Sequence, residues 1–433
     1  MDPLTTGLIG LAILVILLFS RMPVGFVMAL VGFVGFSYLV SLEGGLRIFA
    51  KDVFDIFGSY SLTVVPLFIF MGQIAFYAGI SRRLYDSAYT FLGHYPGGLA
   101  MATIGACAGF AAICGSTNAA AATMASVALP EMRSYKYSPE LATGTVAAGG
   151  SLGILIPPSV IFIVYGIMTE QSIGKLFLAG ILPGILLSTL FILTIYIRVR
   201  LNPEMGPPGP KASVRERVRS LAGVMEMLLI FALVMGGLFF GFFTPTEAGA
   251  AGAFITLLLA LARRQLSWGG FLTALWESVR ISCMVLVIVA GATVFGHFLA
   301  VTRIPYNLAT WVSGLPLPAW AIMGVIVFIY LIGGCFMDAL GMIMLTIPIF
   351  YPVALTLGYD PIWFGVIIVL ITEMGVITPP VGVNVYVVSG VAKDIPLEVI
   401  FRGILPLLGA LILCNIILII FPQIALFLPS FMR

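Results

Sequence analysis

Two groups of polar, glycine and proline residues along the chain could bind a cation. The first group contains Gly115, Ser116, Thr117, Asn118 and the adjacent pair Pro157 and Pro158; the second contains Gly334, Asp338, Thr378 and the pair Pro379 and Pro380. A proline in a helix removes a backbone donor and clashes with the preceding turn, so two together force an unwound stretch. Carbonyls freed there can coordinate a cation, and the exposed helix N-termini attract anions. With the hydroxyl, amide and carboxylate oxygens nearby, these features predict one Na+ site in each group.

The same residues also have a purely structural interpretation. Small residues such as Ala119 to Ala122 promote close helix packing, and prolines in membrane helices can simply kink them. The site interpretation is favoured because a polar turn and a proline pair occur twice. Glu373, six residues before Pro379, is a further candidate, because ionisable residues are costly to bury in a membrane. It could also face a water-filled cavity or pair with a neighbouring helix.

The two groups belong to a repeat in the sequence. The spacing is 222 residues from Pro130 to Pro352, from Pro157 to Pro379 and from Pro158 to Pro380. A Gly-Ile-Leu-Pro motif at 180–183 returns at 403–406, one residue further on. Equivalent interrupted hydrophobic segments in the two halves of a chain are typical of secondary transporters.

The composition is that of a helical membrane protein. Of the 433 residues, 61% are hydrophobic and 9% are charged, and the mean hydropathy is +1.15. The apolar stretches approach or exceed the ~20 residues that a helix needs to cross a bilayer, whereas barrel strands would alternate over about ten. The first run, Leu4 to Phe19, has no basic residue before it and no cleavage site after it, so we expect a retained span.

We expect structural roles for the cysteines, the histidines and two of the acidic residues. The cysteines lie in apolar runs without Cys-x-x-Cys spacing, which predicts small buried side chains; they are Cys107, Cys114, Cys283, Cys335 and Cys414. His94 and His297 have no ligand pattern around them. Thr244-Pro245-Thr246-Glu247 is typical of a capping box, and Glu226 is expected near the cytoplasmic end of its span. We expect no catalytic residue, no transition metal and no cofactor other than Na+ as coupling ion.

The predicted fold class is an all-α polytopic membrane protein with two inverted-topology repeats. Each repeat has five spanning helices, one of them broken at Pro-Pro, and a re-entrant hairpin. In repeat 1–197 the spans are 4–19, 23–40, 60–78, 141–168 (broken) and 176–197, with the hairpin at about 97–130. In repeat 223–433 they are 223–243, 247–262, 279–300, 360–390 (broken) and 397–422, with the hairpin at about 317–352. A basic, proline-rich cytoplasmic linker, 198–222, joins the repeats.

Because five crossings are an odd number, the halves must be inverted relative to each other. With both termini outside, 16 of the 21 Lys and Arg residues fall inside and 5 outside, as the positive-inside rule requires. Counting each hairpin as two full spans gives parallel halves and weakens this bias. The segments Leu42 to Tyr60 and Ser267 to Val279 mix apolar and charged residues, which indicates either interfacial amphipathic helices or ordinary loops.

At these motifs the chain resembles the large membrane subunit of tripartite ATP-independent periplasmic (TRAP) transporters, within the wider ion-transporter superfamily. The resemblance is carried by Gly-Ser-Thr-Asn at 115–118, Ile-Pro-Pro-Ser at 156–159, Asp338 and Thr-Pro-Pro-Val-Gly at 378–382. It implies a permease of the bacterial or archaeal inner membrane with periplasmic termini and an elevator mechanism. It also implies a small four-helix membrane subunit, a periplasmic substrate-binding protein, and Na+-coupled uptake of a carboxylate-bearing solute such as a C4-dicarboxylate or sialic acid.

The resemblance also suggests where the solute binds. It implies a position between the two hairpin tips, with Ser116, Asn118, Ser159, Asp338 and Asn384 as the contacting residues. It does not locate the residue that meets the solute's carboxylate.

Three other functions are weighed against this one. A carrier of the same superfamily could take an organic anion directly from solution, without a binding protein. An intramembrane hydrolase with Ser116 as nucleophile would need a histidine beside it, and neither His94 nor His297 has a motif that places it there. A passive channel fits less well, because re-entrant hairpins in inverted halves suit alternating access. We expect no nucleic-acid partner.

Overall fold

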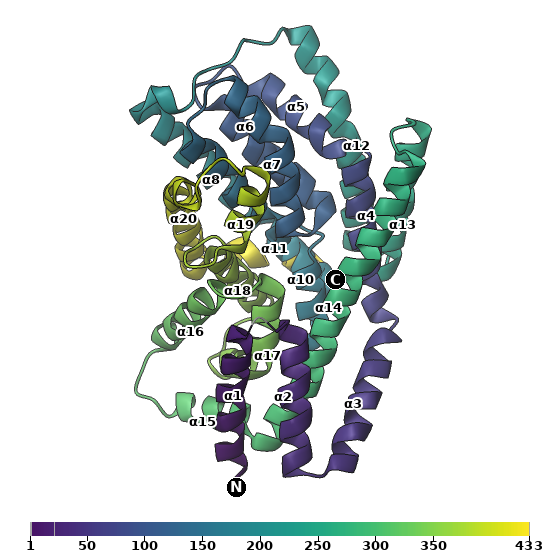
Figure 1. Ribbon diagram of the computed structural model, residues 1–433, viewed down its shortest axis with the longest axis vertical. Helices are drawn as coiled ribbons and strands as arrows, with labels where there is room; N and C mark the ends of the chain where they lie inside the picture. The colour runs from purple at the N-terminus through teal and green to yellow at the C-terminus, as the bar shows by residue number, and fades with distance from the viewer. Residues whose placement is uncertain (1, 21, 433) are drawn as a thin grey trace.

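The chain folds into α-helices and short 3-10 turns, with no β-strand among the residues that the computed structural model describes, 2–20 and 22–432 (Figure 1). The helices of the first half are α1 (Pro3–Phe19), α2 (Val24–Leu39), α3 (Leu42–Phe57), α4 (Val64–Tyr77), α5 (Ile80–Leu92), α6 (Gly98–Cys114), α7 (Thr117–Ser134), α8 (Pro139–Gly150), α9 (Leu152–Leu155), α10 (Val160–Met168) and α11 (Ile173–Leu201). Those of the second half are α12 (Val214–Phe239), α13 (Pro245–Ala262), α14 (Trp268–Thr302), α15 (Ile304–Ser313), α16 (Ala319–Gly334), α17 (Ala339–Thr356), α18 (Pro361–Val376), α19 (Val383–Val391), α20 (Leu397–Ile420) and α21 (Gln423–Leu426).

The elements around the two polar groups recur at the spacing found in the sequence. Helices α7 and α17 both have 18 residues, and both their first and their last residues are 222 positions apart. Helices α8 and α18 start at Pro139 and Pro361, again 222 positions apart. Each predicted hairpin is therefore a pair of helices, α6–α7 and α16–α17, and each predicted broken helix is interrupted at its proline pair.

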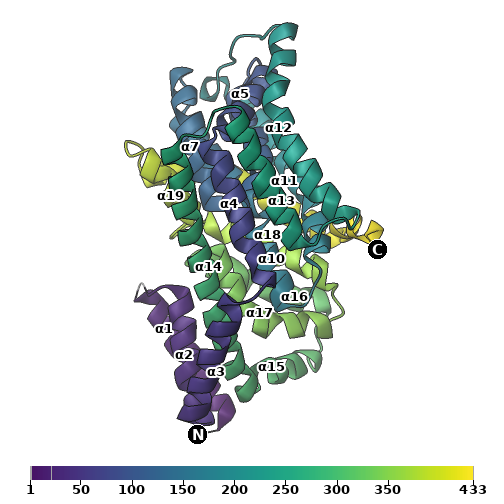
Figure 2. The ribbon, with the colours of Figure 1, turned by 90° about the vertical axis from the view of Figure 1, so that its right-hand side faces the viewer.

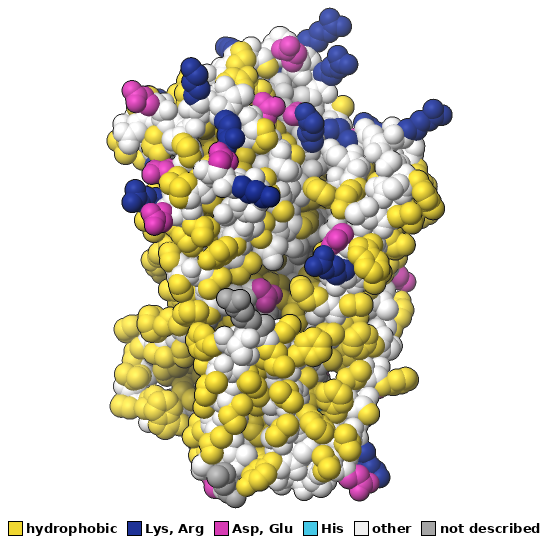
Figure 3. Space-filling model, in the orientation of Figure 1, with side chains coloured by type: hydrophobic (Ala, Val, Ile, Leu, Met, Phe, Trp, Pro, Cys, Tyr) yellow, Lys and Arg dark blue, Asp and Glu magenta, His cyan; other side chains and the backbone are white. Residues whose placement is uncertain are grey.

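Seven helical segments of the described chain are long and apolar enough to cross a membrane, counting the interrupted segment Pro139–Met168 as one, and the number is eight if the bent pair α3–α4 is also one span. Helices α1, α2, α6, α16 and α18 are apolar but have only 16 or 17 residues. Large hydrophobic side chains cover much of the surface, while Lys and Arg gather at the end opposite to α1 and the N-terminus (Figure 3). The molecule is therefore a polytopic membrane protein. The number of ten crossings and their directions stay predictions.

Several segments differ from the sequence-based expectation. Helix α5 was not expected, although its 13 residues alternate apolar and charged positions at helical spacing. Residues 267–279 do not form a separate helix, because α14 continues unbroken from Trp268 to Thr302. Their counterpart 42–57 is a separate helix, inclined by 53° to the helical segment 61–77. Figure 2 shows α3 beside α2 at the lower end of the molecule, continued upward by α4.

The predicted linker is partly helical, because α11 extends to Leu201 and α12 begins at Val214. A capping box starts α12: Ser213 Oγ accepts from the Glu216 N–H, and the Glu216 carboxylate accepts from the Ser213 N–H at 2.7 Å. These bonds from Ser213 hold the pKa of Glu216 below its ordinary value. The predicted capping box at Thr244 and Glu247 is present at the start of α13.

Close helix contacts hold the first half against the second. A Cβ at Gly291 of α14 would lie 2.1 Å from the carbonyl oxygen of Gly25 in α2, so only glycine fits there. A Cβ at Gly403, the first residue of the second Gly-Ile-Leu-Pro copy, would lie 2.0 Å from the carbonyl oxygen of Glu140 in α8. The glycines in these segments therefore bring helices into backbone contact, as is common in membrane bundles.

Two buried carboxylates are paired between elements. Glu226 of α12 is buried and bridges Arg83 of α5 at 2.7 Å and Arg263 at the end of α13 at 2.5 Å. His297 of α14 lies 3.1 Å from the Asp52 carboxylate of α3, a partner that no local pattern in the sequence indicated. Cys283 is exposed, which corrects the expectation that all five cysteines are buried.

Candidate transport site

The first hairpin tip is the turn between α6 and α7. Helix α6 ends at Cys114 because Gly115 adopts a left-handed conformation, with φ of +64°, and Ser116 then caps α7 by accepting from the Ala119 N–H at 3.4 Å. A Cβ at Gly115 would lie 2.6 Å from the carbonyl oxygen of Pro158. The first tip and the first proline break, far apart in the sequence, are therefore in direct contact.

The first proline break is buried between α9 and α10. Pro157 and Pro158 are joined by a cis peptide, and Ser159 caps α10 by accepting from the Phe162 N–H at 3.4 Å. Just before the break, a Cβ at Gly153 would lie 2.6 Å from the carbonyl oxygen of Ser116. Carbonyl, hydroxyl and amide oxygens of the tip and break are thus gathered in one place.

The second hairpin tip lies between α16 and α17, with Asp338 as the residue before α17. Its carboxylate lies against the first turn of that helix, because a Cβ at Gly341 would be 2.8 Å from Asp338 Oδ1. Gly334 packs on α18, where a Cβ at Gly375 would lie 2.5 Å from its carbonyl carbon. The second tip is therefore packed on α18 through Gly334, and its Asp338 carboxylate lies at the start of α17.

The second proline break differs from the first in its exposure. Pro379 and Pro380 are exposed, and the Thr378 hydroxyl donates to the carbonyl of Met374. The chain between α18 and α19 is nevertheless interrupted there, as the sequence predicted. The two proline pairs are therefore at equivalent positions of the repeat but differ in burial.

A small cavity of about 90 Å³ lies between the two tips. Its polar lining includes Ser116, Thr117 and Asn118 from the first tip, Asp338 from the second, and Gln73 from α4. None of its lining residues is a Lys, Arg or His. The structure thus brings together Ser116, Asn118 and Asp338, three of the five residues expected around the solute.

Four helices begin at this cavity. The lining residues include Thr117, Val160, Ala339 and Val383, which are the first residues of α7, α10, α17 and α19. A helix N-terminus carries a partial positive charge and unpaired N–H groups. Two such ends from each half can attract an anionic group without a basic side chain.

The other expected residues lie outside the cavity lining. Ser159 and Asn384 are fully buried and do not line it, and neither do Thr378 and the two proline pairs. Asn384 donates from Nδ2 to the Thr117 hydroxyl at 2.8 Å, and that hydroxyl donates to Glu373 Oε2 at 3.2 Å. Asn384 therefore belongs to a polar cluster behind the first tip.

Two polar residues of this region were not singled out in the sequence. Gln73 interrupts the apolar run of α4, which is a usable signal. Ser151 sits between α8 and α9 close to the Glu373 carboxyl, although no hydrogen bond joins the two side chains in the described chain. The repeat could have indicated Ser151, because it is the counterpart of Glu373, 222 positions earlier in the chain.

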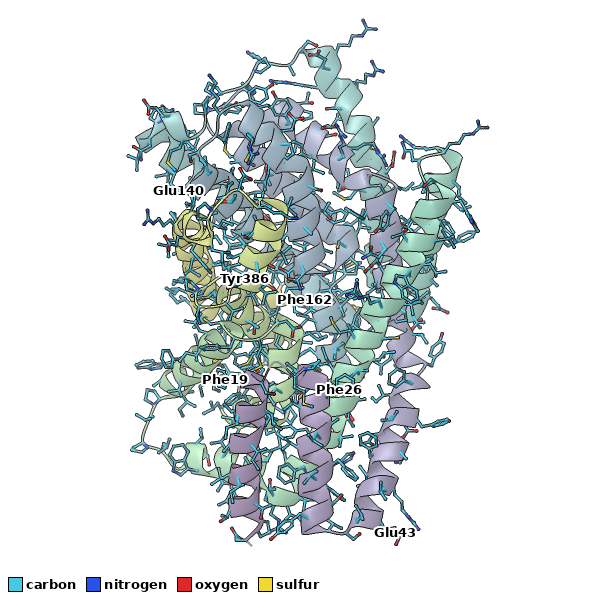
Figure 4. The ribbon with its side chains drawn as sticks, viewed as in Figure 1. Phe19, Phe26, Glu43, Glu140, Phe162 and Tyr386 are labelled. Carbon is cyan, nitrogen blue, oxygen red and sulfur yellow. The ribbon has the colours of Figure 1, made fainter. Side chains whose placement is uncertain are left out.

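A larger, mostly apolar crevice of about 1080 Å³ reaches Asp338 from another side. It runs between α1, α2 and α14 and the second hairpin, and Phe19 and Phe26 line it where α1 ends and α2 begins (Figure 4). Phe19 also packs edge-on against Phe336 of the second tip, with ring centroids 6.0 Å apart. Asp338 is therefore part of the wall between the crevice and the small cavity.

The fold and this site define a class, the polytopic helical transporters. Comparison with known proteins gives the family: residues 11–424 match the one described as "Tripartite ATP-independent periplasmic transporter, DctM component". The chain belongs to this TRAP transporter large permease family.

Individual relatives agree with this assignment. The chain is 38% identical to the C4-dicarboxylate TRAP transporter large permease protein DctM of Pseudomonas aeruginosa, over 92% of each chain. It is 35% identical to the sialic acid TRAP transporter large permease protein SiaM of Vibrio cholerae, over 96% of each. In structure it is similar to the YdaH transporter of Alcanivorax borkumensis, with a TM-score of 0.61, 14% identity and coverage of 90% of this chain and 89% of that one. The chain is a transporter permease and not an enzyme.

Proposed function

We propose that this chain takes up a carboxylate-bearing organic solute by Na+ symport, as the large membrane subunit of a tripartite transporter. The partners in this proposal are a small four-helix membrane subunit and a periplasmic protein that delivers the solute. The solute class follows from relatives that carry C4-dicarboxylates and sialic acid.

The observation that carries the proposal is the cavity shared by the two tips. Polar residues more than 200 positions apart in the chain line one space, together with the N-termini of four helices. Helix N-termini favour an anion, and oxygen atoms with Asp338 favour a cation. An anion and Na+ bound side by side neutralise each other, which suits a site without Lys or Arg.

The residues fit the two proposed Na+ positions unequally. At the first tip the carbonyl of Pro158 faces Gly115, beside the side chains of Ser116, Thr117 and Asn118. At the second, the Asp338 carboxylate supplies a full negative charge, while the Thr378 hydroxyl is already bonded to a carbonyl. Asp338 is therefore the principal candidate ligand of the second position.

The size of the cavity supports a mechanism in which the hairpins move. The cavity measures about 90 Å³. Pockets that bind small organic ligands measure ≈ 300–1,000 Å³. We infer that the tips separate to admit the solute, and that a body containing both hairpins then slides against a scaffold in an elevator cycle.

Reconstitution in liposomes tests the proposal. The permease and the small membrane subunit are inserted in vesicles, a candidate binding protein loaded with radiolabelled solute is added outside, and uptake is followed with an inward Na+ gradient. The expected result is accumulation above the outside concentration, lost when K+ replaces Na+ or the binding protein is left out. Uptake indifferent to the Na+ gradient contradicts the coupling.

The alternative is a carrier of the same superfamily that takes its solute directly from solution. In the same vesicles, uptake of free solute at an equal rate with and without the binding protein supports this alternative. Na+-driven uptake that requires the binding protein excludes it.

A further inference from the structure

The start of α12 carries an exposed basic cluster. Lys211 precedes the helix, and Arg215 and Arg219 lie one turn apart on it, at the end of the molecule opposite to the N-terminus (Figure 1). All three residues are exposed, and none of them forms an ion pair with a described residue. The acidic residue between them, Glu216, instead accepts from the N–H and the hydroxyl of Ser213 in the capping box. The basic cluster therefore presents positive charge that the described chain does not neutralise.

An exposed apolar stripe runs along α12 beside this basic cluster. Val214, Val218, Leu221 and Met225 recur at intervals of three or four residues, which places them on one face of the helix. Their exposed fractions are 79%, 64%, 44% and 59%. Large apolar side chains are unfavourable in water and favourable against lipid, so this face is suited to contact with acyl chains.

The length of α12 places the basic cluster at the surface of the membrane. The 20 residues from Ser220 to Phe239 include a single charged one, Glu226, which is buried and paired. At 1.5 Å per residue they span about 30 Å, the thickness of the hydrocarbon core of a bilayer. Four of the six residues before them, 214–219, are charged. These first turns are therefore expected to lie among the lipid headgroups.

Two hydrogen bonds to the α5 region hold the basic cluster in place. The Ser87 hydroxyl of α5 donates to the carbonyl of Ser220 in α12 at 2.6 Å. The Gly209 N–H, two residues before Lys211, donates to the carbonyl of Gly93 at the end of α5 at 2.7 Å. Side chains on a fixed backbone lose less conformational freedom on binding than side chains on a free loop. The cluster is thus arranged for a ligand before the ligand binds.

We propose that the start of α12 binds an anionic phospholipid. Lys211, Arg215 and Arg219 bind the phosphate of its headgroup, and Val214 and Val218 contact its acyl chains. Clusters of Lys and Arg next to a membrane span attract anionic lipids, so this surface should prefer phosphatidylglycerol to the zwitterionic phosphatidylcholine. The surface lies outside the transport site, and the inference does not depend on the proposed Na+ coupling.

Native mass spectrometry of the purified permease measures this preference. The protein in detergent is titrated with phosphatidylglycerol or with phosphatidylcholine, and the affinities for the first lipid bound are compared. The wild type is expected to bind phosphatidylglycerol more tightly. One basic residue near a membrane surface contributes up to about fivefold in affinity, so Lys211→Gln/Arg215→Gln/Arg219→Gln should weaken phosphatidylglycerol binding by about fivefold or more. Its binding of phosphatidylcholine should not change.

Two further variants separate the site from general effects of charge and folding. Lys136→Gln/Arg200→Gln/Arg402→Gln removes the same charge from exposed residues outside α12 that form no ion pair with a described residue. This matched control should bind phosphatidylglycerol as the wild type does. Arg215→Lys/Arg219→Lys should keep the preference, because a phosphate on a flexible lipid needs the charge and not the shape of the guanidinium group. The Tm of each variant shows whether it is folded.

Four outcomes overturn the proposal. The first two are equal binding of both lipids by the wild type, and equal phosphatidylglycerol binding by the wild type and the first variant. The third is an equal loss of phosphatidylglycerol binding in the matched control. The fourth is displacement of the lipid by inorganic phosphate at constant ionic strength or by the small membrane subunit, which would show that the surface takes a free anion or docks that subunit.

Discussion

At the scale of single residues, the two tips provide different chemistry at equivalent positions. Ser116 and Asp338 are 222 positions apart, and each directly precedes the hairpin's second helix. A serine can contribute only a neutral oxygen to a cation, whereas an aspartate contributes a full charge. The second position should therefore depend on one side chain, and the first on the arrangement of several backbone and side-chain oxygens.

Asp338→Asn should weaken Na+ binding to the purified permease by about tenfold or more, which corresponds to ~1.4 kcal/mol. The reason is that the amide keeps the shape of the side chain and removes its charge. Calorimetric titration with NaCl at constant ionic strength measures this. Asp55→Asn is the matched control, since Asp55 is exposed on α3 and makes no ion pair in the described chain. Equal affinities in wild type and Asp338→Asn would remove Asp338 from the site.

Gly115→Ala should reduce uptake roughly tenfold or more. An alanine at φ of +64° is strained by about 1–3 kcal/mol, and its Cβ would displace the Pro158 carbonyl, now 2.6 Å from that position. Gly241→Ala is the control, because Gly241 also has a positive φ, of +72°, but no atom within 4 Å of its Cβ position. Initial uptake rates normalised to the amount of folded protein measure both. Equal rates in the two variants would mean that strain, and not the Pro158 contact, is what matters.

Sequence reasoning located these residues because their signals are local. Polar turns and proline pairs in apolar surroundings mark interruptions, and the repeat marks them twice. It could not show that the first proline pair is buried and the second exposed, or that Asn384 bonds Thr117 instead of lining the cavity. These facts depend on tertiary contacts, such as the one between Gly115 and Pro158 and the one between Thr117 and Asn384, which lie 267 positions apart.

At the scale of helices, glycines decide how closely neighbouring helices pack. The packing of α2 on α14 is set where Gly25 and Gly291 meet. Helix α14 runs unbroken for 35 residues, whereas α3 and α4 are bent at the corresponding place. Sequence reasoning expected two elements in both halves, because charged residues between apolar runs suggest a boundary, yet 267–279 contains no proline and continues the helix.

Gly291→Ala should destabilise the permease by about 1–3 kcal/mol, the usual range for overpacking. The added methyl would lie 2.1 Å from the Gly25 carbonyl oxygen. Gly296→Ala in the same helix is the control, with no atom within 4 Å of its Cβ position. Thermal unfolding in detergent should show a lower Tm for the first variant and an unchanged one for the second. Identical Tm values in the two variants would show that the close contact between α2 and α14 does not contribute to stability.

At the scale of the whole molecule, the cavity and the crevice meet at the second tip. The cavity between the tips is too small for a dicarboxylate, and the crevice beside α1 and α2 is large but mostly apolar. The contact of Phe19 with Phe336 joins α1 to the moving element that we propose. Transport then requires this contact to break and re-form as the hairpins move.

The central claim is that tips from both halves bind Na+ and drive the solute inward. The most direct measurement is the initial rate of solute uptake against Na+ concentration, in liposomes containing both membrane subunits and supplied with the binding protein. The account predicts no uptake without Na+ and a sigmoidal dependence, with a Hill coefficient of about two if both sites are strongly coupled. Asp338→Asn should lower that coefficient to about one. Wild-type uptake that proceeds equally well without Na+ would contradict the account.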